Sequence, residues 1–309
     1  GTYAGRGVAI FKYTVPIVMM NANRSIAAPW NIYGDQRDSL AELESGWIQL
    51  YAENAQEAYD TILEAYKVAE DPDVMLPVMV NLDGFVLTHT YELLHTVDQD
   101  KVDAYIPYQQ FANRMDLDNP KATCITAGPL YNMEFRYQQH QAMLNAVEKI
   151  KAADKAFGET FGRSYGGVVE AYKCDDAEAI LITLGSVAGT TRCVVDEMRE
   201  QGKKVGLLKI RCMRPFPAKE IVEIVKNAKF VGVLEKDVSF GFEGVVYTDV
   251  SSALKSAGVE IPAANYVGGL GGRSIYKTDI EKIYEELLAG TAKVGEASFV
   301  NLRRDICGA

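Results

Sequence analysis

Residues 15–38 read V-P-I-V-M-M-N-A-N-R-S-I-A-A-P-W-N-I-Y-G-D-Q-R-D, and the fold is predicted outward from them. The stretch opens on a short apolar run, Val15 to Met20, which is typical of a buried strand in a parallel sheet. Arg24 follows shortly, and ligands of open α/β sheets bind beyond the carboxyl ends of the strands. Its planar guanidinium can make two parallel hydrogen bonds to a carboxylate. Arg24 is therefore a candidate carboxylate clamp; the alternative is a surface arginine paired with Asp35 or Asp38.

The residues that follow predict a β-α-β unit. Strands are expected at Trp47–Tyr51 and at Val74–Val80, and a helix between them begins at Asn54, where Glu57 completes a capping-box pattern. A helix is also expected from Ser39 to Glu44. Because such a unit is parallel, the candidate arginine and Asp83 are expected at the same edge of the sheet.

The rest of the chain divides into two parts. From Tyr91 to Tyr172 aromatic residues are frequent and strand periodicity is weak, with one long helix expected at Gln139–Phe157. Strands and helices then alternate, which predicts a second parallel sheet. The expected strands are Glu178–Leu184, Lys204–Met213, Phe230–Leu234 and Ile261–Val267, and the expected helices are Val187–Gln201, Ala218–Asn227, Val246–Ala257 and Thr278–Leu288.

We therefore expect the α/β class, with two doubly wound, mainly parallel sheets. The first domain is placed at residues 1–100, an aromatic-rich connecting segment at 101–172, and the second domain at 173–309. A chain of 309 residues has room for about two domains.

Composition excludes several function classes. The formal net charge of −10 argues against a nucleic-acid partner. No apolar stretch is long enough to span a bilayer, so we expect no membrane partner and a cytoplasmic location. The five cysteines form no C-x-x-C and the three histidines no H-x-x-x-H, so no metal or complete iron–sulfur site is expected on this chain.

Three further patterns are ambiguous. Gly269-x-Gly271-x-x-Ser274 approaches a dinucleotide fingerprint, but it follows the last strand, so a structural turn is favoured. Gly185-Ser186 is favoured as a tight turn over an anion site at a helix N-terminus. Asp83 and His89 could form an acid–base pair, but a structural histidine is favoured.

Several segments resemble one family. They are N-A-N-R-S-I-A-A-P-W-N-I-Y-G-D-Q-R-D-S, G-W-I-Q-L-Y-A-E-N-A-Q-E-A-Y-D, N-L-D-G-F-V-L-T-H, G-R-S-Y-G, L-L-K-I-R-C-M-R-P-F-P, G-G-L-G-G-R-S and N-L-R-R-D. Together they resemble the alpha subunit of the pyruvate:ferredoxin oxidoreductases (pyruvate synthases) of the 2-oxoacid:ferredoxin oxidoreductase family. The likeness covers nearly everything after about Tyr13.

The resemblance implies thiamine-diphosphate-dependent oxidative decarboxylation of pyruvate with coenzyme A to acetyl-CoA and CO2, reversibly, with the electrons passing through [4Fe–4S] clusters to ferredoxin. It implies a pyrimidine-type thiamine-diphosphate domain and a transketolase C-terminal-like domain on this chain. A beta subunit would hold the diphosphate, its Mg²⁺ and a cluster, beside gamma and ferredoxin-like delta subunits.

By position, Arg24 matches the family's arginine for the substrate carboxylate, and Asn23, Asp35 and Asp38 would order its loop. No residue of this chain is assigned as catalytic or as binding the cofactor. The family's cofactor-activating glutamate and a threonine near the substrate have no match here, and Gly1 to Thr14 matches poorly, so we expect an incomplete or divergent N-terminal part.

Other functions remain open on the sequence. One is a sister enzyme acting on 2-oxoisovalerate, 2-oxoglutarate or oxalate, since pocket side chains decide that choice. Another is a non-catalytic scaffold subunit. A free-standing flavodoxin-like binding protein is the least favoured.

Overall fold

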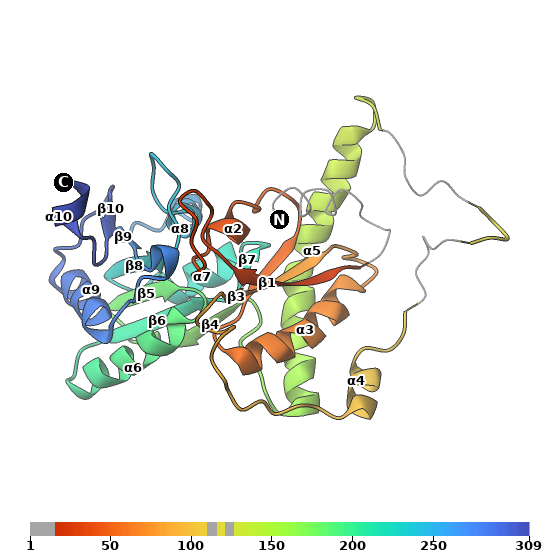
Figure 1. Cartoon of the computed structure of the whole chain (residues 1–309), viewed down its shortest axis with the longest axis horizontal. Coiled ribbons are helices and arrows are strands. Elements are labelled where there is room, and N and C mark those ends of the chain that lie inside the picture. The colour runs from red at the N-terminus through yellow and green to blue at the C-terminus, as the bar shows by residue number, and fades with distance from the viewer. Residues whose placement is uncertain (1–15, 110–115, 121–126, 309) are drawn as a thin grey trace.

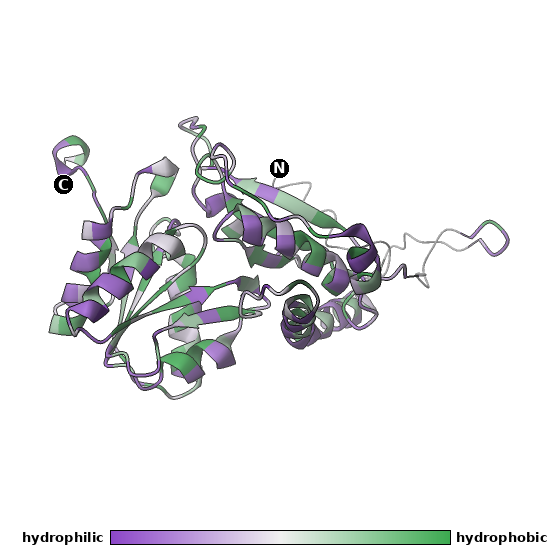
Figure 2. Cartoon of the chain, turned by 90° about the horizontal axis from the view of Figure 1, so that it is seen from below, coloured by the Kyte–Doolittle hydropathy of each residue, from purple (hydrophilic) through white to green (hydrophobic). Residues whose placement is uncertain are grey.

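The computed structural model describes residues 16–109, 116–120 and 127–308. Within these residues the chain forms two sheets, with strand orders β1-β3-β2-β7 and β10-β9-β8-β5-β6-β4. Figure 1 shows the two sheets side by side, with the long helix α5 beside the first and the C-terminus beside β10. The strands are mainly hydrophobic, and hydrophilic residues are frequent on the helices around them (Figure 2).

The first sheet is built largely as predicted. Its strands β1, β3 and β2 are mutually parallel, and β7 pairs antiparallel with β2. The elements are β1 (Val18–Asn23), α2 (Arg37–Leu40), β2 (Ile48–Tyr51), α3 (Ala55–Ala69), β3 (Val78–Asp83) and β7 (Cys212–Arg214). The helix expected at Ser39–Glu44 is wrong in extent, because α2 ends at Leu40 and turns follow it.

The predicted start of α3 is confirmed, with one difference in its cap. The Asn54 side chain accepts a hydrogen bond from the Glu57 backbone N–H at 2.9 Å. The Glu57 carboxylate accepts from the backbone N–H of Glu53 at 2.8 Å, one residue before the cap. Glu57 is also fully buried, which the capping pattern alone does not indicate.

Segment 101–172 supplies structure to both sheets. Helix α4 (Gln99–Tyr105) precedes α5 (Asn132–Phe161), which is longer at both ends than predicted. Small residues of α5, among them Ala142 and Ala146, pack in one core with α3 and the first sheet. Strand β4 (Val169–Tyr172) pairs antiparallel with β6 of the second sheet. The domain limits near residues 100 and 172 stay a prediction.

The second sheet is parallel except for the edge strand β4. Its further elements are β5 (Ala179–Thr183), α6 (Val187–Glu200), β6 (Val205–Ile210), α7 (Ala218–Val225), β8 (Phe230–Glu235), α8 (Val245–Ser256), β9 (Ala263–Val267), the turn η1 (Leu270–Gly272), α9 (Lys277–Ala289), β10 (Ala297–Phe299) and α10 (Arg304–Cys307). The predicted α/β class with two mainly parallel sheets is confirmed.

One predicted strand is wrong. Residues Lys204–Met213 were expected to form a single strand, but the chain forms β6 in the second sheet and, beyond Arg211, β7 in the first. Arg211 itself is fully buried between the two sheets. The chain therefore crosses from one sheet to the other at this residue.

Candidate functional site

The predicted edge forms at the carboxyl ends of β1 and β3. The two strands are parallel neighbours, with Asn23 in register with Asp83. Arg24 directly follows Asn23, so the arginine and Asp83 lie at the same edge, as predicted. In open α/β sheets this edge is where ligands bind.

Asp38 fastens the start of the Arg24 loop. Its carboxylate accepts hydrogen bonds from Asn23 Nδ2 at 2.7 Å and from the backbone N–H of Arg24 at 2.8 Å. Burial raises the pKa of Asp38, while these hydrogen bonds oppose the rise. Asn23 is fully buried, and its Oδ1 has no hydrogen-bond partner among the described residues.

Asp35 fastens the end of the same loop to the second sheet. Its carboxylate forms an ion pair with Arg37 at 2.8 Å and accepts the Gly271 backbone N–H at 3.0 Å. Asn31 Nδ2 donates to the Gly271 carbonyl at 2.9 Å. The glycine-rich segment near Gly271 therefore holds the Arg24 loop in place. This contact gives the segment a structural role, in line with the turn that is favoured over a dinucleotide site.

The Arg24 guanidinium is exposed on this loop. Its Nη1 donates to the backbone carbonyl of Ile32. Within the part of the chain that the structure describes, the guanidinium forms no ion pair, because Asp35 pairs with Arg37 and Asp38 receives the Arg24 backbone instead. The surface pairing considered from the sequence is therefore absent here. The remaining donors are free to bind an arriving carboxylate.

Two glycines let the backbone pack closely beneath Arg24. A Cβ added at Gly84 would lie 2.0 Å from the Asn23 carbonyl oxygen and 3.4 Å from Arg24 Nε. A Cβ added at Gly34 would lie 2.6 Å from the Gly84 carbonyl oxygen and 2.7 Å from that of Asn23. Real Cβ atoms do not approach oxygen this closely, so only glycine fits at either position.

Asp83 binds the second sheet's elements and does not pair with His89. Its carboxylate accepts hydrogen bonds from the backbone N–H of Ser186 at 2.7 Å and from Lys236 Nζ at 3.0 Å, as well as from the Ser186 hydroxyl. Burial opposes ionisation of Asp83, but Lys236 and Ser186 outweigh it and hold the pKa of this carboxyl below its usual range. The anion at the N-terminus of α6 is thus the chain's own Asp83.

His89 has a different environment. Its ring stacks on Phe85 with centroids 4.7 Å apart, and its Nδ1 shares a hydrogen bond with the Thr88 hydroxyl. Sequence reasoning missed Lys236, although it lies two residues beyond the predicted strand Phe230–Leu234, at the same end of a strand that drew attention to the arginine.

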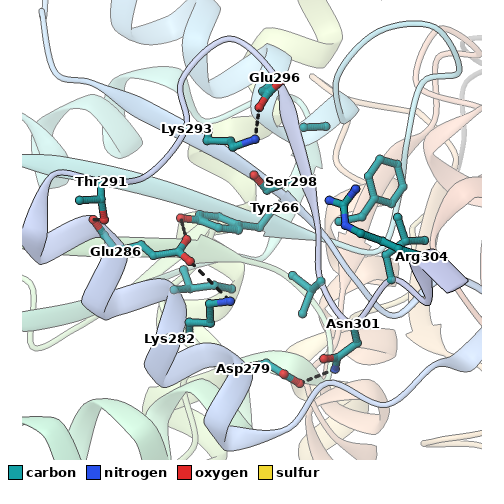
Figure 3. Close-up of a pocket in the computed structure, with 15 residues that line it drawn as sticks. Tyr266, Asp279, Lys282, Glu286, Thr291, Lys293, Glu296, Ser298, Asn301 and Arg304 are labelled. Atoms are coloured by element: carbon teal, nitrogen blue, oxygen red, sulfur yellow. Dashed lines mark hydrogen bonds and ion pairs between the residues drawn. The ribbon is translucent and has the colours of Figure 1, made fainter. Parts of the chain in front are cut away.

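A cavity of about 240 Å³ lies between the carboxyl ends of the two sheets. Its walls include Gly34, Asp83, Gly84, Ser186, Lys236 and Arg273. A second hollow, of about 620 Å³, lies between α9 and β10 (Figure 3). Two of the lysines on its walls have carboxylate partners there, Lys293 with Glu296 at 2.5 Å and Lys282 with Glu286 at 3.9 Å.

Buried ion pairs join the first sheet's helix α3 to β6 and α6 of the second sheet. Lys209 lies 3.0 Å from Glu53, 2.8 Å from Glu57 and 3.3 Å from Glu170. Arg192 of α6 binds Glu53 at 2.7 Å and Glu170 at 3.0 Å. Every charge in this group has an opposite charge within contact distance, as burial requires.

Arg211 is the centre of an adjoining group. It binds Glu57 at 3.2 Å, Glu64 at 2.7 Å and Asp154 at 3.5 Å, and it donates to the Thr61 hydroxyl at 2.9 Å. Burial raises the pKa of Glu64 to about 7, against the attraction of Arg211. The two groups together fix the orientation of the sheets.

Residues 16–109, 116–120 and 127–308 contain no group of three or more His, Cys, Asp or Glu arranged to hold a metal ion. Over the same residues, no helix combines the length and the apolar character needed to cross a membrane.

Two family models match the chain. The first, pyruvate flavodoxin/ferredoxin oxidoreductase, thiamine diphosphate-binding, covers residues 8–155, and the second, pyruvate:ferredoxin oxidoreductase core domain II, covers residues 177–280. Pyruvate synthase subunit PorA of Methanothermobacter thermautotrophicus is 48% identical over 87% of this chain and 69% of its own length. This chain belongs to the pyruvate:ferredoxin oxidoreductase family.

Other members are nearly as similar to this chain. Pyruvate synthase subunit PorA of Thermotoga maritima is 42% identical over 94% of this chain and 74% of its own length. Ketoisovalerate oxidoreductase subunit VorA of Pyrococcus horikoshii is 41% identical over 88% of this chain and 69% of its own length. The family match begins at residue 8, within the stretch Gly1 to Thr14 that was expected to match the family poorly.

The fold is also shared with a solved structure. The 2-oxoglutarate:ferredoxin oxidoreductase from Magnetococcus marinus superposes with a TM-score of 0.61 at 15% identity, over 91% of this chain and 50% of that chain. This likeness supports the expected fold of an oxidoreductase subunit in this family.

Proposed function

We propose that this chain is the alpha subunit of a pyruvate:ferredoxin oxidoreductase, or pyruvate synthase, acting only in complex. The proposal rests on one observation above the others: a chain up to 48% identical to PorA subunits presents, at the edge formed by the carboxyl ends of β1 and β3, an arginine that has no carboxylate partner among the described residues. The reaction is the reversible oxidative decarboxylation of pyruvate with coenzyme A to acetyl-CoA and CO2, with ferredoxin taking the electrons.

In this proposal Arg24 holds the carboxylate of pyruvate. Its backbone is fixed by Asp38, and the loop's far end is fixed by Asp35. Such fixing lowers the entropy lost when the guanidinium orients the substrate. Thiamine diphosphate supplies the carbanion chemistry of decarboxylation when it is bound. This chain's contribution is to bind and orient the acid.

The cofactors and partners extend beyond this chain. Its N-terminal part carries the thiamine-diphosphate-binding family domain. Among the described residues, however, no three His, Cys, Asp or Glu side chains are clustered in a way that could hold a metal ion such as Mg²⁺. A beta subunit therefore holds Mg²⁺, the diphosphate and a [4Fe–4S] cluster in this proposal, with gamma and ferredoxin-like delta subunits, coenzyme A as co-substrate and the cytoplasm as location.

The test is Arg24→Ala in the anaerobically purified complex. Loss of a charge-assisted bidentate contact is expected to raise KM for pyruvate by about 30-fold or more, since such contacts contribute roughly 2–5 kcal/mol. Arg303→Ala, which removes an exposed arginine paired with Asp305, is the matched control and should leave KM unchanged. An intact complex with unchanged KM in Arg24→Ala would favour a scaffold subunit instead.

A sister activity is the second candidate, because a ketoisovalerate oxidoreductase subunit is 41% identical to this chain. Initial rates with pyruvate, 2-oxoisovalerate, 2-oxoglutarate and oxalate separate the two. We expect the highest kcat/KM with pyruvate. A higher kcat/KM with 2-oxoisovalerate would identify that acid as the substrate, and Arg24 would then bind its carboxylate in the same way.

A further inference from the structure

We propose that Asp83 and Lys236 form a positioning pair for the Arg24 site, so that the second sheet controls how the first binds substrate. The inference rests on the proposed function, since it assigns these residues a part in binding the 2-oxoacid. It follows from three sets of contacts, which run from the second sheet to the arginine.

The first contacts fix Asp83 from the second sheet. Ser186 begins α6 and Lys236 follows β8, and both donate to the Asp83 carboxylate. The Lys236 side chain is 12% exposed and that of Asp83 is 3% exposed, so the pair is largely shielded from water. An ion pair in that environment loses little strength to screening by solvent and salt.

The space around the pair admits no larger neighbour. Gly185 has φ +71°, and a Cβ there would lie 2.9 Å from Asp83 Oδ2 and 2.7 Å from Gln36 Nε2. Gln36 Nε2 also donates to Asp83 Oδ1 at 3.1 Å. Both carboxylate oxygens are therefore occupied, and the side chain has one orientation.

The last contacts carry this orientation to Arg24. Gly84 is the next residue along the chain, and it packs against the Asn23 carbonyl with no room for a Cβ. The same glycine lies under Arg24 Nε. A shift of Asp83 therefore moves Gly84, and a shift of Gly84 moves the arginine, because the backbones are already in contact.

The experiment uses the purified complex and Lys236→Ala. We expect KM for pyruvate to rise about 10-fold with kcat changed less than about twofold, because the arginine's placement is disturbed while the cofactor's chemistry is not. Lys229→Ala is the matched control: it directly precedes β8, where Lys236 directly follows it, and it pairs with Glu178 at 2.9 Å while 74% exposed. Its KM should equal that of the wild type.

Chemical rescue separates positioning from a general loss of structure. n-Propylammonium carries the three carbons and the ammonium that Lys236→Ala removes, and the 240 Å³ cavity bordering this residue can admit it. We expect it to restore KM, whereas propan-1-ol, which lacks the charge, should not. If Lys236→Ala yields no complex, Lys236→Met keeps most of the volume and should show the same rise in KM.

The double variant Arg24→Ala/Lys236→Ala decides the mechanism. If Lys236 acts through the arginine, its removal adds no further rise in KM once Arg24 is gone. Multiplying KM changes, or a KM in Lys236→Ala equal to that of Lys229→Ala, would overturn the inference. If Arg24→Ala alone leaves KM unchanged, the proposed clamp fails; if it raises KM and Lys236→Ala does not, only the positioning pair fails.

Discussion

Replacing Arg211 with methionine is expected to loosen the contact between the two sheets. The guanidinium is fully buried and lies between Glu57, Glu64 and Asp154. Methionine fills most of the aliphatic volume but leaves the buried carboxyl groups of Glu64 and Asp154 without their cation, while Glu57 keeps its contact with Lys209. The perturbation therefore concerns charge far more than packing.

The magnitude follows from the cost of breaking a buried ion pair. Removing one partner of such a pair costs about 3–5 kcal/mol, because the remaining charge stays buried without compensation. The lower value corresponds to opening that is roughly 100-fold more frequent. The loss of stability should be smaller at pH 5 than at pH 8, because acid protonates the carboxyl groups that have lost their cation. Glu64 is protonated first, since burial raises its pKa to about 7.

Hydrogen–deuterium exchange with mass spectrometry measures this opening in the intact complex. Peptides that cover α3 and β6 should exchange about 100-fold faster in Arg211→Met. Arg303→Met, which removes an exposed arginine from its pair with Asp305, should leave exchange unchanged. Equal exchange in the two variants would refute the view that the buried charges hold the sheets together.

Two further perturbations address the same chain. Glu64→Gln should abolish one pH dependence of the protein's stability. Burial raises the pKa of Glu64 in the folded state to about 7, so the protonated side chain contributes stability below the ordinary pKa of glutamate. This contribution, up to about 3 kcal/mol, is lost as the pH rises to 7. Unfolding curves of variant and wild type that stay parallel from pH 4.5 to 8 would contradict this, with the exposed Glu159→Gln as control. Gly84→Ala should cost about 1–3 kcal/mol and raise KM for pyruvate, because its Cβ would meet the Asn23 oxygen at 2.0 Å. Gly128→Ala, whose Cβ meets nothing within 4 Å, should do neither, and identical behaviour of the two alanine variants would count against the close packing.

Local signals were enough for the first sheet's order of elements. These signals are the apolar runs before Arg24 and Asp83 and the helix cap at Asn54. Each depends only on residues close together in the sequence, so it can be recognised without knowledge of the tertiary structure. The shared edge then followed from the parallel connection. The structure adds that Asp38 receives the Arg24 backbone, which spacing could not distinguish from an ion pair with its side chain.

The crossing between sheets could not be predicted in this way. Residues 205–213 form an almost continuous apolar run, interrupted by Lys209 and Arg211, and such a run indicates a buried strand without indicating its partner. Glu57, the partner that these two cations share, lies 152 positions from Lys209 and 154 from Arg211. Burial of the charges depends on that distant helix.

The role of Asp83 was missed for the same reason. Ser186 and Lys236 are separated from it by 103 and 153 positions. At Ser186 the sequence favoured a tight turn over an anion site, whereas in the structure the Asp83 carboxylate of the chain itself lies at this helix N-terminus. A charged residue just beyond the carboxyl end of a predicted strand, such as Lys236 two residues after Leu234, is the signal that would have added it to the candidates.

The most direct test of the proposed function is the pyruvate-dependent reduction of ferredoxin by the native complex that contains this chain, purified without oxygen. The account predicts a hetero-oligomer carrying thiamine, iron and acid-labile sulfide that reduces ferredoxin only when both pyruvate and coenzyme A are present. A monomer or homodimer that lacks all three, or a complex that carries them and reduces no ferredoxin with pyruvate, would contradict it.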